Sequence, residues 1–418
     1  MRPTLPLLLA SLIVTAPVLA ATPEQTAQAA LRAAPVWDGH NDVPEQLRER
    51  RKDMIADFDF RDTTATADAA KGYPAMHTDL ARLRRGHVGA QFWSVYVSAD
   101  LPEPQAVQAT LEQIDVTKRL IARYPQEMQL ATSSAEVERA MKAGKIASLI
   151  GMEGGHSIGG SLGVLRQMYA LGARYMTLTH FKTLAWADAA TDAPVHGGLT
   201  DFGRDVVREM QRLGMLVDLS HVSADTMRDA LAVAKAPVIF SHSGARAINT
   251  HPRNVPDDVL ALLKANGGLV MVDFAPDYVS EEVRGWSAAK AAETARLAAI
   301  DIGDPAAAKQ GAVDWLAAHS APKATLAQVA DHIDQVRKIA GIDHIGLGGD
   351  FDGVGSLPTG LEDVSTYPAL FTELARRGYS RGDLEKISSG NMLRVMKAAE
   401  AYAAAHRGDA PLETPTGF

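Results

Sequence analysis

The sequence lacks three features that would each have pointed to a different class of protein: cysteine, an excess of positive charge, and a long apolar run beyond its first twenty residues. Without cysteine, disulfides, thiolate metal ligands and cysteine nucleophiles are all excluded. The 50 acidic residues outnumber the 42 Lys and Arg, and the formal net charge of -8 argues against nucleic acid as a partner. Any metal site must therefore use Asp, Glu and the 13 histidines.

The first twenty residues have the pattern of an export signal. Arg2 precedes an almost wholly apolar stretch from Leu7 to Ala20, and Val18-Leu19-Ala20 fits a small-residue cleavage site. The stretch is short for a membrane span, although a core helix or an uncleaved anchor would also use it. We predict a signal peptide at 1–20, a single domain at 21–418 without a membrane span, and a periplasmic or secreted location.

The rest of the chain alternates between short apolar segments and longer segments with helical periodicity. Asp201–Leu213 is one such helix, because Phe202, Val206 and Met210 form an apolar stripe. The apolar segments are nearly continuous, as in parallel strands that are covered on both faces. Eight strands alternating with helices predict an α/β fold, a (β/α)8 TIM-type barrel. The predicted strands are Val36–His40, Gly89–Val97, Ala147–Glu153, Tyr175–His180, Leu216–His221, Pro237–His242, Gly268–Phe274 and His344–Asp350. Further helices are predicted at Ser223–Ala234, Asp257–Ala265 and Leu326–Ala340.

Two segments interrupt this alternation. Met54–Pro74 is polar and rich in turn residues, which indicates an excursion after the first strand. Ala275–Ala324 is too long for a plain connection and carries Ala-rich helical pieces with Trp286 and Trp315. We interpret 275–324 as an insertion at one end of the barrel, either a lid or structural padding.

Polar residues of metal-binding type follow strand after strand. His40 and Asp42 lie at the end of the first predicted strand, and Glu153 lies at the end of the third. A histidine or an aspartate lies at the end of four later strands. In a (β/α)8 barrel the carboxyl ends of all strands meet at one face, where the active site is built. The residues at these ends are His40, Asp42, Glu153, His180, His221, His242, Asp350 and Asp352.

A shared metal centre explains these residues better than separate structural roles do. A lone buried histidine is usually a satisfied core residue, and a lone glutamate beside glycines is usually a turn residue. Together, however, so many polar groups at strand ends would cost several kcal/mol each if they were buried without partners. Ligands without sulfur suit Zn, Mn, Fe or Co, and zinc is the commonest for hydrolysis. The number of ligands predicts two ions that share a carboxylate and ionise a bridging water.

Six of these segments give the sequence a specific resemblance to the membrane dipeptidase (renal dipeptidase) family of zinc peptidases. The segments occur in the same order as in the family, and the resemblance extends from about residue 36 to about residue 395. The matching segments are Asp38-Gly39-His40-Asn41-Asp42, Gly151-Met152-Glu153-Gly154, Leu178-Thr179-His180, Asp218-Leu219-Ser220-His221-Val222-Ser223, Ser241-His242-Ser243 and Gly348-Gly349-Asp350-Phe351-Asp352-Gly353.

The resemblance implies a role for each residue. His40 and Asp42 would hold one zinc ion, His221 and His242 the other, and Glu153 would bridge the two. His180 would steady the tetrahedral intermediate. Arg253 would meet the terminal carboxylate of the substrate, for which a guanidinium fork is well suited. Asp350 would orient the bridging water and pass its proton to the leaving amine, with Asp352 as the rival for this role. These implied roles lie on His40, Asp42, Glu153, His180, His221, His242, Arg253 and Asp350.

The chain also departs from the family pattern near the expected pocket. Phe181-Lys182-Thr183 follows His180 where family members often have Asn and Pro, and Ala275 stands where they often have Tyr. The mammalian members carry cysteines and a lipid anchor, which this chain lacks. The metal chemistry is therefore better supported than the identity of the substrate.

The sequence thus predicts a zinc-dependent dipeptidase in which a metal-bridging hydroxide attacks the amide of a small dipeptide. The resemblance further implies a homodimer, tolerance of a C-terminal D-residue, and β-lactam hydrolysis. One alternative keeps the two metals but acts on N-acyl amino acids or lactones. A second alternative is a binding protein on an inactive barrel, for which ligands should be missing; none is missing here.

Overall fold

The computed structural model describes residues 21–413. The predicted signal peptide at 1–20 lies outside this part and stays a prediction. Within 21–413, no helix combines the length and the apolar character needed to cross a membrane.

The central feature is a closed barrel of eight parallel strands. Six strand pairs join β1 to β9, β9 to β8 and so on down to β4, and β2 pairs with both β1 and β4. The β2–β4 pair, in register from Ala90↔Ala147 to Tyr96↔Glu153, closes the ring. The predicted (β/α)8 barrel is confirmed. The strands of the ring are β1 (Val36–Asn41), β2 (Val88–Tyr96), β4 (Ile146–Glu153), β5 (Ala173–Thr177), β6 (Leu216–Asp218), β7 (Ile239–Phe240), β8 (Leu269–Val272) and β9 (Ile345–Leu347).

All eight predicted strands are present, but several end earlier than the sequence suggested. β5, β6 and β9 stop at Thr177, Asp218 and Leu347, three residues before the polar residue that was placed at the strand end. His221 and Asp350 have φ values of 66° and 54°, which lie in the left-handed region and cannot continue a strand. These residues are therefore on the loops that leave the barrel.

One strand was not predicted. β3 (Met128–Leu130) pairs with the first residues of β4 on the outside of the ring. It is only three residues long and carries Gln129 between two apolar residues. So short a segment gives no periodicity from which a strand could be recognised.

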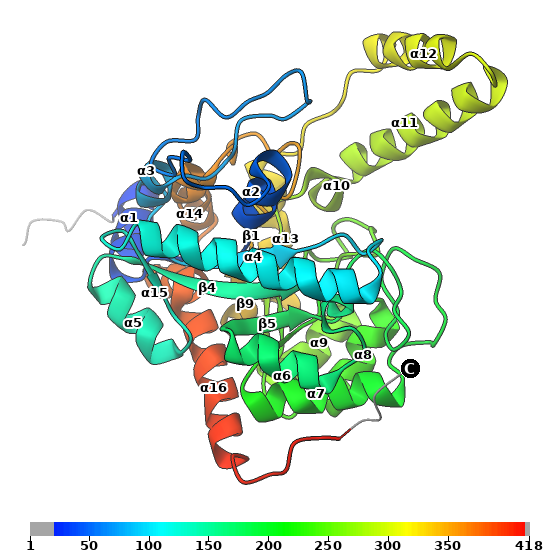
Figure 1. Cartoon of the computed structure of the whole chain (residues 1–418). Helices are drawn as coiled ribbons and strands as arrows, with labels where there is room; N and C mark the ends of the chain where they lie inside the picture. Colours follow the sequence, from blue (N-terminus) through cyan, green and yellow to red (C-terminus); the bar gives the residue numbers. More distant parts are fainter. Residues whose placement is uncertain (1–20, 414–418) are drawn as a thin grey trace, which may run out of the picture.

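Helices surround the barrel (Figure 1). Each of the four helices predicted by name is found within one residue of its expected ends, as α7, α8, α9 and α13. The helices outside the insertion are α1 (Pro23–Ala33), α2 (Val43–Arg51), α3 (Leu80–Arg85), α4 (Glu103–Arg123), α5 (Ser134–Lys142), α6 (Leu162–Ala170), α7 (Asp201–Leu213), α8 (Ala224–Val233), α9 (Asp257–Asn266), α13 (Leu326–Ile339), α14 (Tyr367–Arg376), α15 (Arg381–Glu385) and α16 (Asn391–Ala405). Short 3-10 turns lie at Gly155–Ile158, Ile342–His344 and Val364–Thr366, and a π-helical turn at Lys386–Gly390.

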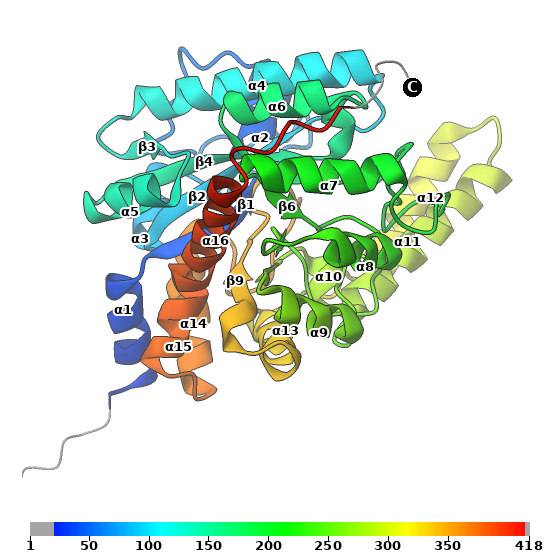
Figure 2. The same cartoon turned by 90° about the horizontal axis from the view of Figure 1, so that it is seen from below.

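The barrel interior is filled by large apolar side chains. Trp37, Phe92, Tyr175 and Met271 belong to one buried cluster, which Met396 of α16 joins. Figure 2 shows α16 running beside the ends of the strands. Burying each such side chain fully contributes about 1.5–3 kcal/mol, so this packing holds the strands in fixed positions. The other end of the barrel, where the carboxyl ends of the strands lie, is covered by polar loops.

The predicted insertion forms a helical hairpin that stands away from the barrel (Figure 1). After the short α10 (Pro276–Val279), α11 (Glu281–Ile300) runs outward and α12 (Pro305–Ala318) returns beside it. The rings of Trp286 and Trp315 lie 5.9 Å apart between the two helices. Of the residues in α11 only Val283 is buried, and none in α12 is.

Candidate metal centre

Seven of the side chains that the sequence analysis selected meet at the carboxyl end of the barrel. Each is at most 8% exposed, although the residues are spread over 310 positions from His40 to Asp350. A cavity of about 190 Å³ opens onto most of them. Three groups of ligand atoms come close enough to hold ions: His40, Glu153 and His242; Glu153, His180 and His221; and His40, Asp42 and Asp350.

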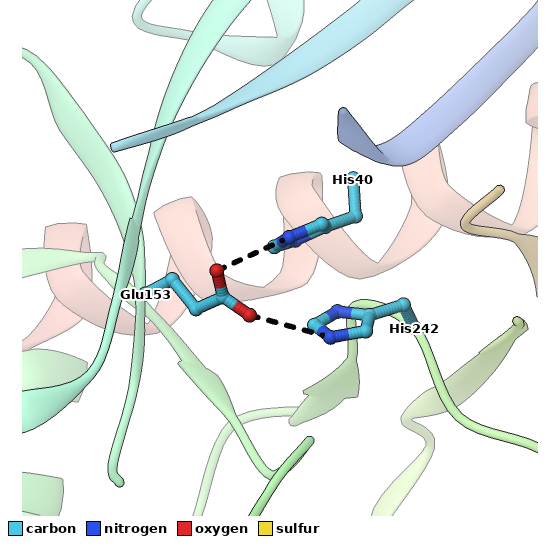
Figure 3. A group of neighbouring side chains, drawn as sticks. All are labelled: His40, Glu153 and His242. Atoms are coloured by element: carbon cyan, nitrogen blue, oxygen red, sulfur yellow. Dashed lines mark ion pairs between the residues drawn. The ribbon is translucent and has the colours of Figure 1, made fainter. Parts of the chain in front are cut away.

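Glu153, the last residue of β4, lies in the middle of this cluster. Its Oε1 is 3.0 Å from Nε2 of His221 and 3.4 Å from Nε2 of His242. Its Oε2 is 3.4 Å from Nε2 of His40. Figure 3 shows the carboxylate between the rings of His40 and His242, with one oxygen directed to each. A carboxylate whose two oxygens face two different sets of ligands has the geometry of a bridge.

The backbone brings the ligands together through close approaches. His40 lies in β1, and Asp42 directly follows the last residue of that strand, at the start of α2; their side chains approach to 3.3 Å at the mouth of the barrel. Gly353 packs against the acidic groups: a Cβ there would lie 2.3 Å from Oδ2 of Asp42 and 2.4 Å from Oδ1 of Asp350. Any larger residue at 353 would push these two carboxylates out of place.

The polar atoms of the cluster fit metal ions better than they fit one another. Nε2 of His40 and both carboxylate oxygens of Asp42 are buried without a hydrogen-bond partner among the described residues. Nε2 of His40 lies 3.3 Å from Oδ2 of Asp42, and the Nε2 atoms of His221 and His242 lie 2.9 Å apart. Ligands about 2.0–2.1 Å from a tetrahedral ion are roughly 3.3 Å from each other. The donor set of imidazoles and carboxylates therefore suits cations, and the sulfur-free set fits the expected metals.

A second layer of hydrogen bonds orients two of the histidines. Nδ1 of His40 is 2.8 Å from the Tyr175 hydroxyl, and Nδ1 of His242 is 2.9 Å from Oγ of Ser241. Ser241 in turn donates to Oδ2 of Asp218 at 2.6 Å. With Nδ1 engaged in this way, each ring directs Nε2 toward Glu153, as outer partners of metal-binding histidines do.

The buried charges shift the pKa values of the cluster in opposite directions. Burial lowers the pKa of His180 to about 4, so its ring is neutral at pH 7. Burial also raises the pKa of Asp350 well above its usual value, and the acidic neighbours Asp273 and Asp42 add to this. For Glu153, burial is outweighed by the charge of His40 and by hydrogen bonds from His221 and His40, which hold its pKa well below the usual range. The neutral imidazole of His180 and the carboxyl group of Asp350, which binds a proton more tightly than usual, thus lie beside the ionised carboxylate of Glu153.

The geometry distinguishes Asp350 from its rival Asp352. Asp350 lines the cavity, and its Oδ1 is 4.0 Å from Nε2 of His40. Asp352 accepts a hydrogen bond of 2.7 Å from the backbone N–H of His77 and donates its own N–H to Nδ1 of that residue at 3.0 Å. Asp352 therefore fastens the segment before α3 to the loop after β9, while Asp350 faces the site.

Arg253 is almost fully buried, at 1% exposure, and lines the same cavity. Its guanidinium donates to the carbonyl oxygen of His242 at 3.2 Å and lies 5.2 Å from the centre of the Tyr278 ring. Its Nε has no hydrogen-bond partner within residues 21–413, and its guanidinium has no carboxylate within ion-pair distance there. The cavity thus contains a cation that lacks its counter-ion.

Several residues of the site were not selected from the sequence. Tyr96 and Phe181 pack against His180, with ring centres 4.4 and 3.9 Å from its own, and Tyr278 reaches the cavity from α10. Glu45 also lines the cavity, three residues after Asp42 in the first turn of α2. Its spacing from Asp42 is the one signal in the sequence, because residues three apart lie on the same side of a helix.

A buried cluster of histidines and carboxylates at the carboxyl end of a (β/α)8 barrel is typical of the metal-dependent hydrolases. The sequence profile of the membrane dipeptidases (peptidase family M19) matches residues 24–409. Dipeptidase 3 of Macaca fascicularis is 41% identical over 392 residues, which are 93% of this chain and 70% of that protein. The chain therefore belongs to the membrane dipeptidase family, peptidase family M19, and is a peptide-bond hydrolase.

Solved structures show the same fold. The probable dipeptidase PvdM from Pseudomonas aeruginosa superposes with a TM-score of 0.75 at 24% identity, over 91% of this chain and 99% of that one. A metallopeptidase from Rhodobacter sphaeroides, bound to a phosphinate mimic of the dipeptide L-Ala-D-Ala, gives a TM-score of 0.69 at 23% identity, over 88% and 99%.

Proposed function

We propose that the chain is a zinc-dependent dipeptidase that cleaves dipeptides with a free C-terminal carboxylate. The observation that carries this proposal is the pairing, in one cavity, of the Glu153 cluster with the unpaired buried guanidinium of Arg253. The first supplies the chemistry of amide hydrolysis, and the second recognises a negative charge close to the bond that is cut. Membership of the family and the dipeptide mimic bound by the Rhodobacter sphaeroides structure support the same substrate class.

Five residues would hold the two ions. His40 and Asp42 would bind one, His221 and His242 the other, and Glu153 would bridge them; the 2.9–3.4 Å separations among these ligand atoms support this division. When bound, two zinc ions lower the pKa of a water to near neutrality and polarise an amide carbonyl.

The remaining groups would handle the proton and the developing charge. His180 is neutral, so its ring N–H can donate to the oxyanion that forms when water adds to the carbonyl carbon. Asp350 would take the proton of the attacking water and give it to the amide nitrogen as the C–N bond breaks. Its raised pKa makes it a competent proton donor in the second step. The products are two amino acids.

Arg253 would pair with the terminal carboxylate of the substrate. A guanidinium matches a carboxylate with two parallel hydrogen bonds, and burial strengthens each of them. Because Arg253 and Glu153 line the same cavity of about 190 Å³, the carboxylate must be close to the scissile amide. The bond that is cut is then the last amide bond before the C-terminus, which in a dipeptide is the only one. We extend the proposal to substrates with a C-terminal D-residue and to β-lactams.

The substitution Arg253→Met tests this reading. We expect kcat/KM for a dipeptide to fall by about 10- to 100-fold, since a charged hydrogen bond is lost, while the slower turnover of the same dipeptide with an amidated C-terminus is unchanged. A chelator should abolish both activities, and zinc should restore them. Unaltered dipeptide turnover by the Arg253→Met protein would refute the carboxylate contact.

The second candidate is a hydrolase of the same metal type that acts on N-acyl amino acids or lactones. N-acyl amino acids would also place a carboxylate on Arg253, so they differ from dipeptides only at the other end of the substrate, whereas a simple lactone offers Arg253 no carboxylate. A panel of dipeptides and N-acyl amino acids with a common C-terminal residue separates them.

We further propose that residues 1–20 direct export to the periplasm or to the medium, and that the enzyme is a homodimer. N-terminal sequencing of the protein recovered outside the cytoplasm should begin at Ala21 if the signal peptide is cleaved. Light scattering of the same material should give twice the mass of one chain.

A further inference from the structure

We propose that Glu45 determines specificity by binding a cationic group on the N-terminal residue of the substrate, its α-ammonium. This inference rests on the proposed dipeptidase function and names the second anchoring contact of that substrate. The juxtaposition that carries it is an unpaired carboxylate and an unpaired guanidinium in a single cavity, with Glu153 among the side chains that line it.

Glu45 is held at the cavity by the start of α2. The helix begins at Val43, directly after Asp42, so its first turn lies at the mouth of the barrel. Glu45 is half-buried and lines the cavity together with Asp42, Tyr96 and Glu153. It has no hydrogen bond and no ion pair with any residue in the described range 21–413.

The neighbours of Glu45 on the same helix are, in contrast, already engaged. Gln46 donates to the carbonyl oxygen of Asp352 at 2.7 Å and accepts from Arg50. Arg48 pairs with Asp53 at 3.2 Å and with Glu112 at 3.0 Å. The cations of α2 therefore have other partners, and the charge of Glu45 stays uncompensated.

No group within residues 21–413 neutralises Glu45. The other acidic groups of this part of the cavity, Asp42 and Glu153, are among the five proposed metal ligands, whereas Glu45 is not. A substrate ammonium that enters the cavity therefore meets a carboxylate that is free to pair with it, and a charge-assisted hydrogen bond between the two would be strong in this half-buried place.

Glu45 and Arg253 also lie on well-separated sides of the site. Glu45 follows β1, whereas Arg253 follows β7, and these strands are three places apart around the ring of eight, where four is the maximum. The electrostatic neighbours of Arg253 are His180, His221 and Asp273 rather than Asp42 and Glu49. A dipeptide is a zwitterion with one charge at each end, so it can place its carboxylate on Arg253 and its ammonium on Glu45.

This arrangement would select dipeptides over N-acyl amino acids. An acyl group brings no cation, so Glu45 would be covered without a partner when such a substrate binds. Sites built to pair with a polar group of the substrate discriminate strongly against analogues that lack it, because the site's own buried group is then left unpaired.

The experiment compares an alanyl dipeptide with its propionyl analogue, which has the same amide and the same carboxylate but no ammonium. The variants are Glu45→Gln and, as a matched control, Glu49→Gln, which removes the same charge from the exposed face of α2 one turn further on. Zinc content is measured for every protein, so that a loss of metal is seen directly.

For wild type we expect kcat/KM to favour the alanyl dipeptide. In Glu45→Gln this preference should shrink by about 10- to 100-fold, through loss of dipeptide turnover, while propionyl turnover and zinc content are retained. Glu49→Gln should behave as wild type. An equal fall for both substrates, or no change for either, would overturn the inference. A wild-type enzyme that cleaves no dipeptide would instead refute the proposed function itself.

A second pair of substrates identifies the source of the cation. Lysyl and norleucyl dipeptides differ by a side-chain ammonium and share the α-ammonium. If Glu45→Gln abolishes a preference for lysyl over norleucyl and leaves the alanyl to propionyl ratio intact, Glu45 binds the side-chain cation of the same residue. If only the alanyl to propionyl ratio changes, the α-ammonium is the partner.

Discussion

The mouth of the barrel and the α11–α12 hairpin differ in which side chains they bury and which they expose. At the mouth, His40, Glu153 and His242 are at most 4% exposed. On the hairpin, Ile302 is 87% exposed and Ile300 63%. One region buries ionisable groups and the other leaves aliphatic groups in water.

The difference shows which pattern carries functional information. Hairpin charges pair locally on the same helix turn, as in Arg296 with Glu293 at 2.6 Å, and surface pairs of this kind contribute about 0–1 kcal/mol. Buried ionisable groups cost several kcal/mol each unless something compensates them. The buried ionisable groups at the mouth therefore need further partners, such as the proposed metal ions, to compensate their charge. The charges on the hairpin already compensate one another.

The largest expected effect comes from replacing a glutamate by glutamine at the mouth, in comparison with the same replacement on the hairpin. Glu153→Gln removes the charge between the two proposed ions, so zinc content should fall below two per chain and kcat/KM should fall by more than the roughly 10- to 100-fold typical of outer-shell changes. Glu293→Gln on α11 should leave both unchanged. Metal analysis and dipeptide kinetics measure this; equal behaviour of the two variants would remove the distinction between the regions.

An intermediate effect is expected where the insertion joins the barrel. His332 of α13 accepts a hydrogen bond from the N–H of Ala245 and bonds to the carbonyl oxygen of Val279 at the end of α10. Burial lowers its pKa to about 4, against about 6.5 in the unfolded chain. The unfolded state thus binds protons first as the pH falls, so this stability is complete above about pH 6.5 and declines by up to about 3 kcal/mol toward pH 4.

Denaturant unfolding at pH 7 and about pH 5 checks this sign. The difference between the two free energies of unfolding should be smaller in His332→Gln than in wild type. His319→Gln, at the exposed end of α12, serves as the control and should keep the wild-type difference. A His332→Gln protein with the full wild-type pH dependence would contradict the assignment.

The smallest effect is expected from removing the hairpin. None of the residues that line the cavity belongs to α11 or α12, although Tyr278 of α10 does line it. Joining Gly285 to His319 by a short Gly-Ser linker should therefore leave kcat/KM and zinc content unchanged. A loss of activity with zinc retained would show that the hairpin acts as a lid after all.

The sequence was sufficient for the barrel and for the residues that meet at its mouth, for a physical reason. Parallel strands buried on both faces leave nearly continuous apolar runs, and a charged residue that ends such a run stands out, as Glu153 does after Ile146–Met152. Barrel topology then places all strand ends together without further information. The helix of 201–213 was equally clear because its apolar stripe is uninterrupted.

The features that the sequence did not reveal depend on contacts between residues that are far apart in the chain. Tyr175 reaches His40 because Gly151 leaves room for its ring: a Cβ at 151 would lie 2.0 Å from Cζ of Tyr175. Placement at a strand end favoured Asp350 over Asp352, but β9 ends at Leu347, and the contact of Asp352 with His77 is what distinguishes the two. Glu45 looks like an ordinary helix-start acid, and only the cavity shows that it lacks a partner.

The central claim is that Glu153 bridges two cations at the mouth of the barrel. Anomalous diffraction from crystals of the zinc-loaded enzyme, recorded at the zinc absorption edge, tests it most directly. The account predicts two peaks about 3.5–4 Å apart, one beside His40 and Asp42 and the other beside His221 and His242, with Glu153 between them. A single peak, or peaks remote from these five residues, would contradict it.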